Sequence, residues 1–174
     1  MNSKTRKRHF IFVFLWLGFT VLAFAFFSKQ RLVNFDNENT LLDIDYVQLG
    51  HYLQRYSSPD NNGLASSVIH FSKPGCECQQ FSESHIEDIN KLALGSQFKI
   101  QNVVLDHDEI IPAVPSVAII DPTGEVIYFG PYGQGLGCSQ TTGFAQTMLS
   151  NFLKGFAANI VIREAKGCYC SLQA

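Results

Sequence analysis

An apolar run without a single charge extends from Phe10 to Phe27. As a helix it would be about 27 Å long, close to the roughly 30 Å hydrocarbon core of a bilayer. A basic cluster precedes it, consisting of Lys4, Arg6, Lys7 and Arg8. Because basic flanks are typical of the cytoplasmic side, the pattern predicts a cytoplasmic segment at 1–9 and a transmembrane signal anchor at 10–27.

A cleaved signal peptide is the alternative, since Ala23-Phe24-Ala25 fits the small-x-small pattern of a cleavage site. The apolar run continues through Phe26 and Phe27, which favours the anchor. Both interpretations export the rest of the chain. The next stretch is polar and rich in Asn, and predicts a tether at 28–42.

Residues 43–174 show the alternating periodicities of one α/β domain. In order, the pattern predicts a helix at 44–56, a strand at 67–71, a helix from Cys78 to Gly95, strands at 98–105, 116–120 and 125–129, and a helix that begins near 139–142. A strand-helix-strand unit makes its strands parallel, and the turn Asp121-Pro122-Thr123-Gly124 adds an antiparallel hairpin.

The charge of the chain is unevenly distributed. It has 13 Lys and Arg and 15 Asp and Glu, and six of the basic residues but none of the acidic ones lie before Leu32. The exported part therefore has 7 basic and 15 acidic residues, a net charge of −8. An acidic domain without a basic stripe argues against nucleic acid as a partner. The glycine-rich stretch 133–137 lacks the Lys-Ser/Thr of a phosphate loop, so we expect no nucleotide and no other cofactor.

Two cysteines one residue apart, Cys76 and Cys78, follow the strand at 67–71 and a Pro-Gly turn. A thiol at a helix N-terminus ionises more readily, because unsatisfied N–H groups and the helix dipole favour negative charge there. On a helical wheel Cys78 falls on the apolar stripe and Cys76 opposite it, which predicts an outward Cys76 and an inward Cys78.

The segment from Val114-Pro115 through Asp121-Pro122-Thr123-Gly124 to Val126, together with the cysteine turn, resembles membrane-anchored, periplasmic thioredoxin-like proteins of the TlpA type. The resemblance covers about 64–157 and implies a thioredoxin-like fold in the periplasm, anchored in a bacterial inner membrane. It also implies thiol-disulfide exchange with protein partners: Cys76 attacks, Cys78 resolves, and Pro115 is a cis-proline whose segment docks the partner's chain.

Two features depart from that family. One residue instead of two separates Cys76 and Cys78, so a bond between them would close a small, strained ring. His70 stands where the family keeps a buried acid, six residues before the attacking cysteine. A histidine there either moves the proton during exchange or is a core residue with its hydrogen bonds satisfied.

Five cysteines in an exported domain indicate disulfides, with one thiol left over. Cys138 is either a third redox thiol near Cys76 or a free or structurally paired cysteine. Cys168 and Cys170 repeat the one-residue spacing, and three uses are open for them. They bond to each other, they staple the C-terminal tail onto Cys138 or the cysteine turn, or they relay electrons to that turn.

Two other functions compete with disulfide exchange. The first is binding or delivery of a soft metal, Cu(I) or Zn(II), by the four thiolates of Cys76, Cys78, Cys168 and Cys170. Zinc pairs are more often spaced C-x₂₋₄-C and the chain has no Met-rich stretch, which argues against it. The second is a scaffold with purely structural cysteines. We expect His85 in the core and His107 in a solvated acidic loop with Asp106 and Asp108.

Overall fold

The computed structural model describes residues 3–30, 32–57, 59–60, 63–135, 143–156 and 159–173, which form two compact units, Met1–Leu32 and Val33–Ala174. The elements in chain order are α1 (Ser3–Gln30), β1 (Val33–Asn34), η1 (Thr40–Leu42), α2 (Tyr46–Gln54), β2 (Pro59–Asp60), β3 (Gly63–Leu64), β4 (Ser67–Ser72), η2 (Glu77–Ser82), α3 (Glu83–Gly95), β5 (Lys99–Val104), β6 (Ala113–Val114), β7 (Ser116–Ile120), β8 (Val126–Pro131), α4 (Phe144–Leu153), β9 (Ile160–Val161), β10 (Lys166–Gly167) and β11 (Cys170–Ser171). The labels η1 and η2 denote 3₁₀ helices.

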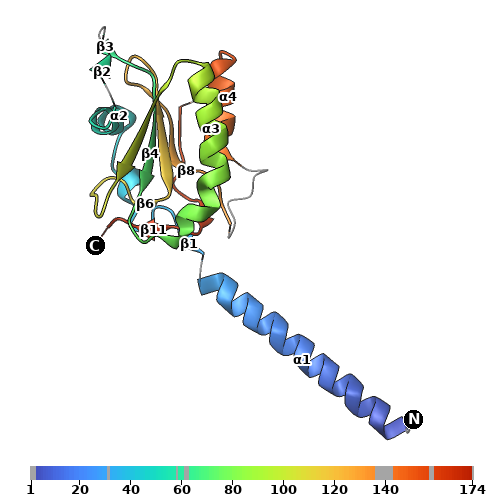
Figure 1. The fold of residues 1–174 in the computed structure, drawn as a ribbon. Coiled ribbons are helices and arrows are strands. Elements are labelled where there is room, and N and C mark those ends of the chain that lie inside the picture. Colours follow the sequence, from blue (N-terminus) through green and yellow to red (C-terminus); the bar gives the residue numbers. More distant parts are fainter. Residues whose placement is uncertain are drawn as a thin grey trace. The chain divides into compact units, whose positions relative to one another are not determined.

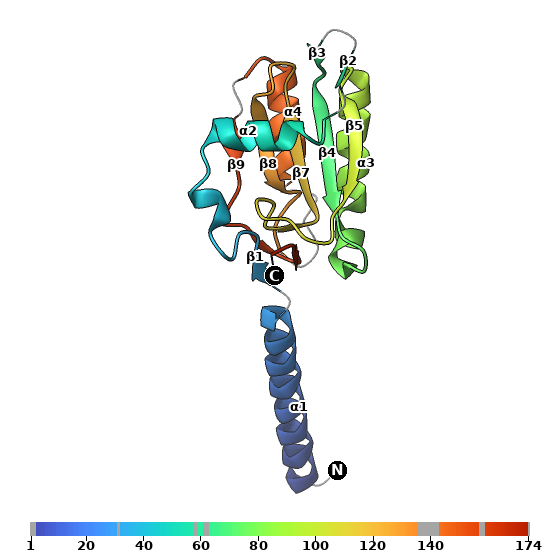
Figure 2. The same ribbon diagram turned by 90° about the vertical axis from the view of Figure 1, so that its left-hand side faces the viewer.

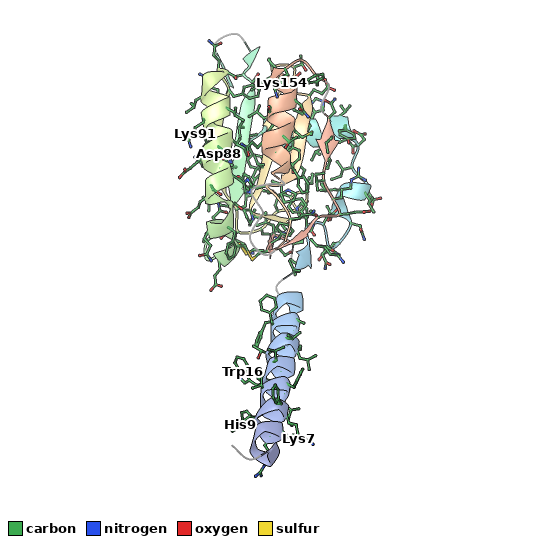
Figure 3. The ribbon with its side chains drawn as sticks, turned by 90° about the vertical axis from the view of Figure 1, so that its right-hand side faces the viewer. Lys7, His9, Trp16, Asp88, Lys91 and Lys154 are labelled. Carbon is green, nitrogen blue, oxygen red and sulfur yellow. A yellow bond between two sulfur atoms is a disulfide. The ribbon has the colours of Figure 1, made fainter. Side chains whose placement is uncertain are left out.

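The first unit is the single helix α1. Its part Lys7–Phe27 has a mean hydropathy of 2.5 and is long and apolar enough to cross a membrane. Trp16, on this helix, is 62% exposed (Figure 3). Large exposed apolar side chains all along a helix are stable in lipid, where no water has to be ordered around them. The structure therefore confirms one apolar N-terminal helix, longer by several residues than the predicted span at 10–27.

The second unit is built on a mixed five-stranded sheet with the strand order β5-β4-β7-β8-β9 (Figure 2). β4 and β5 are parallel and joined through α3, β7 pairs antiparallel with both β4 and β8, and β8 and β9 are parallel. The central strands are buried on both faces, which explains the nearly continuous apolar run of β7. The predicted α/β class, with its parallel crossover and hairpin, is confirmed.

Helices cover both faces of this sheet (Figure 1). On one face α3 and α4 pack against each other and against the sheet, and Val68, Ile89 and Leu149 belong to the core beneath them. On the other face α2 packs on β7 and β8, and the core includes Leu53 and Phe71. Successive strand residues alternate between the two cores, as the pleat requires.

The helix boundaries follow local chemistry. Asp45 is the N-cap of α2, and its carboxylate accepts a hydrogen bond from the amide of Gln48 at 2.8 Å. The predicted helix from Cys78 to Gly95 consists of η2 followed by α3, and it ends at Gly95 as expected. α4 begins at Phe144, and the predicted start near 139–142 lies outside the described residues.

The prediction of a polar tether at 28–42 is wrong from Val33 onward. Phe35 and Leu41 are each 1% exposed and belong to the same core as Phe71. The buried carboxylate of Asp36 accepts two backbone hydrogen bonds of 2.9 Å from the start of η1, and β1 pairs antiparallel with β10. The Asn-rich composition suggested a flexible linker, but two apolar anchors and one capping acid are enough to order it.

Candidate functional site

The cysteine turn is built by the residues between β4 and η2. Gly75 has a φ of +75°, a conformation that side chains rarely adopt, so glycine is required there. The amide of Cys76 donates to the carbonyl oxygen of Lys73 at 3.2 Å and closes the turn. Cys76 is then the N-cap residue of η2, which confirms the prediction that it lies just before the helix.

Two disulfides cross-link this turn to a distant part of the chain. Cys76 bonds to Cys170, with Cα atoms 6.0 Å apart, and Cys78 bonds to Cys168, with Cα atoms 5.4 Å apart. The sulfur bonds are drawn in yellow at the end of the domain where β4 leads into η2 (Figure 3). We call Cys76 and Cys78 the turn pair, and Cys168 and Cys170 the strand pair.

The bond between Cys76 and Cys78, which the sequence left open, is therefore absent in this state of the protein, and so is a bond between Cys168 and Cys170. Of the alternatives left open by the sequence, the structure has the staple onto the cysteine turn. Cys170 begins β11, and Cys168 lies at a bend between β10 and β11. Both reach the turn pair, and the physical advantage is that each cysteine has a partner without a strained small ring.

Both cysteines of the turn pair are buried, each 8% exposed. The expectation of an outward Cys76 is wrong, because its sulfur is bonded to Cys170 rather than open to solvent. The Cys76 Sγ is 3.9 Å from the carbonyl oxygen of Val114, and the Val114-Pro115 peptide bond is cis. Pro115 therefore has the cis form and the position beside Cys76 that the sequence resemblance implied.

Sulfur atoms are concentrated at this site beyond the two bonds. The Sγ atoms of Cys76, Cys78 and Cys170 all lie within 4.8 Å of one another. One sulfur of the second disulfide is thus close to both sulfurs of the first. A short side-chain rotation would bring them into range for exchange, and the same three thiolates would fit around one soft metal ion when reduced.

The strand pair lies in residues 165–173, which are called here the C-terminal segment. β11 pairs antiparallel with β6, with Cys170 opposite Val114. Leu172 is 1% exposed, and its amide donates to the carbonyl oxygen of Pro112 at 3.0 Å. Tyr169 is also buried, and its hydroxyl donates to the carbonyl oxygen of Gly133 at 2.7 Å.

His70 lies on β4 and is 4% exposed. Its Nε2 is 2.8 Å from Oδ1 of Asn90 and its Nδ1 is 2.5 Å from the hydroxyl of Tyr132. With a carbonyl oxygen facing Nε2, that nitrogen carries the proton and Nδ1 accepts from Tyr132. Burial lowers the pKa of His70, against a smaller opposite effect of the Asn90 hydrogen bond. The geometry matches the expectation of a satisfied core histidine; proton transfer by His70 stays a prediction.

Asp108 is a supporting residue that sequence reasoning assigned to a solvated loop. It is 6% exposed, and its carboxylate accepts from the amides of Ile110 and Ile111 and from the hydroxyls of Tyr52 and Tyr56. Burial, and then the hydrogen bond to Asp108, raise the pKa of Tyr52. This acid orders the loop that leads into β6. An Asp two and three residues before Ile-Ile is the local signal for such a turn.

The remaining predicted positions divide between buried and exposed. His85 is 2% exposed and lies in the core as expected, whereas His107 is exposed. Cys138 lies outside the described residues, so its predicted redox or structural role is not placed. The described part of the loop before it does approach the strand pair, since Gly135 forms a bridge with Gly167.

Comparisons with known proteins place the domain in a family. Residues 48–172 match the family described as a domain of unknown function, DUF6436, and this span includes the turn pair, the strand pair and His70. No curated protein and no solved structure gives a significant match. Since the matched span covers well over half of the chain, the protein belongs to the DUF6436 family.

Proposed function

We propose that the protein is a membrane-anchored thiol-disulfide exchange protein that acts on protein partners through Cys76 and Cys78. The observation that carries this function is the arrangement of four cysteines as two adjacent disulfides, with three sulfur atoms within 4.8 Å of one another. A purely structural staple needs one such bond. Two bonds with neighbouring sulfurs can also exchange partners with each other and with a third thiol.

The exchange would proceed by two displacements. A thiolate of a partner dithiol attacks the Cys76 Sγ, a mixed disulfide forms, and Cys170 leaves as a thiolate. The second partner thiolate then attacks the partner sulfur of the mixed disulfide, and Cys76 leaves. The partner becomes a disulfide, while Cys76 and Cys170 gain two electrons and take up the two protons that the partner loses. The same steps run in reverse with an oxidised partner, and Cys76 is then the attacking thiolate.

Cys78 gives the site a second resolving thiol. Its sulfur lies within 4.8 Å of both Cys76 and Cys170. Once the first disulfide is reduced, a thiolate from it can attack the Cys78 sulfur and displace Cys168. The site would therefore accept up to four electrons in two steps, and Cys76 and Cys78 would be linked transiently during resolution.

The fold is consistent with this function. The order strand, helix, strand, hairpin and helix, together with Pro115 beside Cys76, supports a thioredoxin-like architecture. The helix α1, with the basic cluster at its start, supports an anchor in a bacterial inner membrane and a domain in the periplasm, where disulfides persist.

A trapping experiment tests the proposal. In the full chain, purified in detergent, Cys78→Ser with Cys170→Ser removes both resolving thiols. After reduction and addition of oxidised glutathione, we expect a glutathione adduct on Cys76 that persists, located by mass mapping. The matched chain that retains Cys78 and Cys170 should release it. The control is the same variant with Cys76→Ser added. If the two chains carry the same total amount of bound glutathione, the function is refuted.

Binding of a soft metal is the second candidate, and the three clustered sulfurs favour it specifically. Thiolates are the ligands that Cu(I) prefers, and the sulfur atoms of Cys76, Cys78 and Cys170 lie within 4.8 Å of one another. Titration of the fully reduced chain with Cu(I) would test this. Stoichiometric Cu(I) binding that is lost in the variant Cys168→Ser with Cys170→Ser supports delivery of metal. If the reduced chain binds Cu(I) no more tightly than this variant does, delivery of metal is excluded.

A further inference from the structure

The C-terminal segment lies where a bound polypeptide would dock beside Cys76. It runs antiparallel to β6, with Cys170 opposite Val114 and Ser171 opposite Ala113 (Figure 1). The pairing continues beyond β11, since Leu172 donates to Pro112 and accepts a 3.1 Å hydrogen bond from the amide of Asp108. Main-chain bonds to a sheet edge are the general way in which an extended peptide is bound.

Its side chains are also held as those of a bound peptide would be. Cys168 and Cys170 both reach the turn pair, and Leu172, two residues further on, enters the core. Tyr169 has its ring 5.5 Å from that of Phe35, edge to face. Alternate side chains in separate contacts provide specificity in this binding mode.

The backbone pairing of this segment is shorter than that of the central sheet. β11 and β6 pair over two residues each in a two-stranded sheet of their own, whereas β4 and β7 pair over five. A two-residue ladder opens easily on its own. The two disulfides, which span 94 and 90 residues, convert this weak contact into a permanent one for as long as they remain oxidised.

We propose that residues 168–173, the part of the C-terminal segment that follows β10, are an internal ligand, released by reduction, that occupies the docking site of the redox partner. In the oxidised protein the segment covers Cys76, Cys78 and the edge of β6. Two dithiol equivalents reduce the two disulfides to four thiols and are themselves oxidised to two disulfides. The segment then leaves, and the edge of β6 with the turn pair becomes open to another chain.

The contacts of the segment describe the partner that fits. It presents an extended stretch with a cysteine in the place of Cys170 and a large apolar residue two positions later, in the place of Leu172. The half-buried Lys73, whose ammonium donates to the carbonyl oxygen of Ser171 at 2.9 Å, would hold the backbone of the partner in the same way. This inference rests on the proposed function and names the regulation of the same site.

Hydrogen exchange measures release directly. In the full chain in detergent, the amides of Asp108 and Leu172 are expected to exchange about 100-fold faster after reduction, because the tether no longer holds the segment. Amides in β4 and β7 should keep their protection. The variant Cys168→Ser with Cys170→Ser should match the reduced protein without any reductant. Unchanged protection of Asp108 and Leu172, or loss of protection throughout the sheet, would overturn the proposal.

Peptide binding tests the exposed site. The probe is a labelled synthetic peptide with the sequence of residues 165–174 and both cysteines replaced by serine, measured by fluorescence anisotropy. The full chain with Cys168→Ser and Cys170→Ser should bind it at least about tenfold more tightly than the oxidised full chain. A peptide with Asp in place of Leu172 is the matched control, and it should bind the two chains with equally low affinity. Equal binding of the first peptide by both chains would contradict the inference.

The two proposals fail separately. If Cys76 forms the glutathione adduct but the segment stays protected after reduction, exchange survives and release does not. If the segment is released but no adduct forms on Cys76, the segment is a reducible cover over a site with another use. In that case the Cu(I) titration decides whether the exposed thiolates bind metal.

Discussion

The turn pair and the strand pair have the same Cys-x-Cys spacing, but they lie beside strands that are paired to very different extents. Cys76 and Cys78 follow β4, which pairs with two neighbours in the centre of the sheet. Cys168 and Cys170 lie on and beside a two-residue edge strand. The first pair therefore adjoins a long strand of the central sheet, whereas the second adjoins a ladder of only two residues.

This difference assigns the two pairs to different tasks. A nucleophile must be held in place while its bonds change, which suits cysteines at the end of a buried strand. A segment that has to leave and return needs weak non-covalent contacts, which suits the edge pairing with β6. Identical spacing in the sequence therefore does not imply an identical role, and each of the following predictions tests the comparison.

The largest effect is expected from removal of the turn pair. Cys76→Ser with Cys78→Ser should lower the rate of disulfide exchange with a dithiol peptide about 1,000-fold or more, as loss of a nucleophile does. Replacement of Cys168 and Cys170 by serine should lower it far less. Stopped-flow kinetics on the full chain would measure both, with Lys91→Ala as a control, since Lys91 has an exposed ion pair with Asp88 on α3 (Figure 3). Equal decreases in the exchange rate for the two double variants would contradict the assignment of different tasks to the two pairs.

Reduction of both disulfides should destabilise the domain without unfolding it. Each bond closes a loop of 90 residues or more, and loss of both should lower the free energy of unfolding by about 4 to 5 kcal/mol. Loss of either bond alone should change it little, because the remaining bond closes nearly the same loop. Urea unfolding of oxidised and reduced protein, followed by circular dichroism, gives the difference. Complete unfolding on reduction would mean that the turn pair is not held by the sheet.

Leu172→Ala should distinguish the C-terminal segment from the core. In the oxidised protein it should cost about 2 to 3 kcal/mol, because a buried leucine leaves a cavity. In the reduced protein the segment is displaced and the cost should fall towards zero. Leu149→Ala in α4, which is fully buried as well, should cost about 3 kcal/mol in both states. Parallel losses for the two substitutions would show that the segment stays bound after reduction.

His70 should make stability depend on pH in the acidic range. Its folded pKa is lowered by burial, whereas the unfolded chain titrates near about 6.5. Below about pH 6.5 the unfolded state binds more protons, so the free energy of unfolding falls as the pH falls, by up to about 1.4 kcal/mol per unit. His70→Gln should be less stable at pH 8 and lack this slope. An unchanged slope would place the titration elsewhere.

The same variant addresses proton transfer during exchange. If His70 only supports the core, His70→Gln should leave the shape of the pH-rate profile of exchange unchanged while lowering stability. If it moves a proton, release of the partner from the mixed disulfide should slow more than the initial attack. Single-turnover kinetics separates the two steps, and equal slowing of both would exclude the catalytic role.

The features that the sequence predicted correctly are those set by residues close together in the chain. The strand at 116–120 and the helix end at Gly95 follow from periodicity and from residues that stop or start an element. The apolar helix follows from composition, and the place of Cys76 just before a helix follows from the Pro-Gly turn. These features depend on neighbours a few residues away, which the chain order already contains.

The tertiary structure decided which distant segments meet. The one-residue spacing of Cys168 and Cys170 does not say what lies opposite them, and their partners are 90 and 94 residues away. Phe35 and Asp108 were misassigned for the same reason, because their burial depends on packing partners far along the chain. Side-chain direction is a local property, whereas pairing and burial are set by the closure of the whole core.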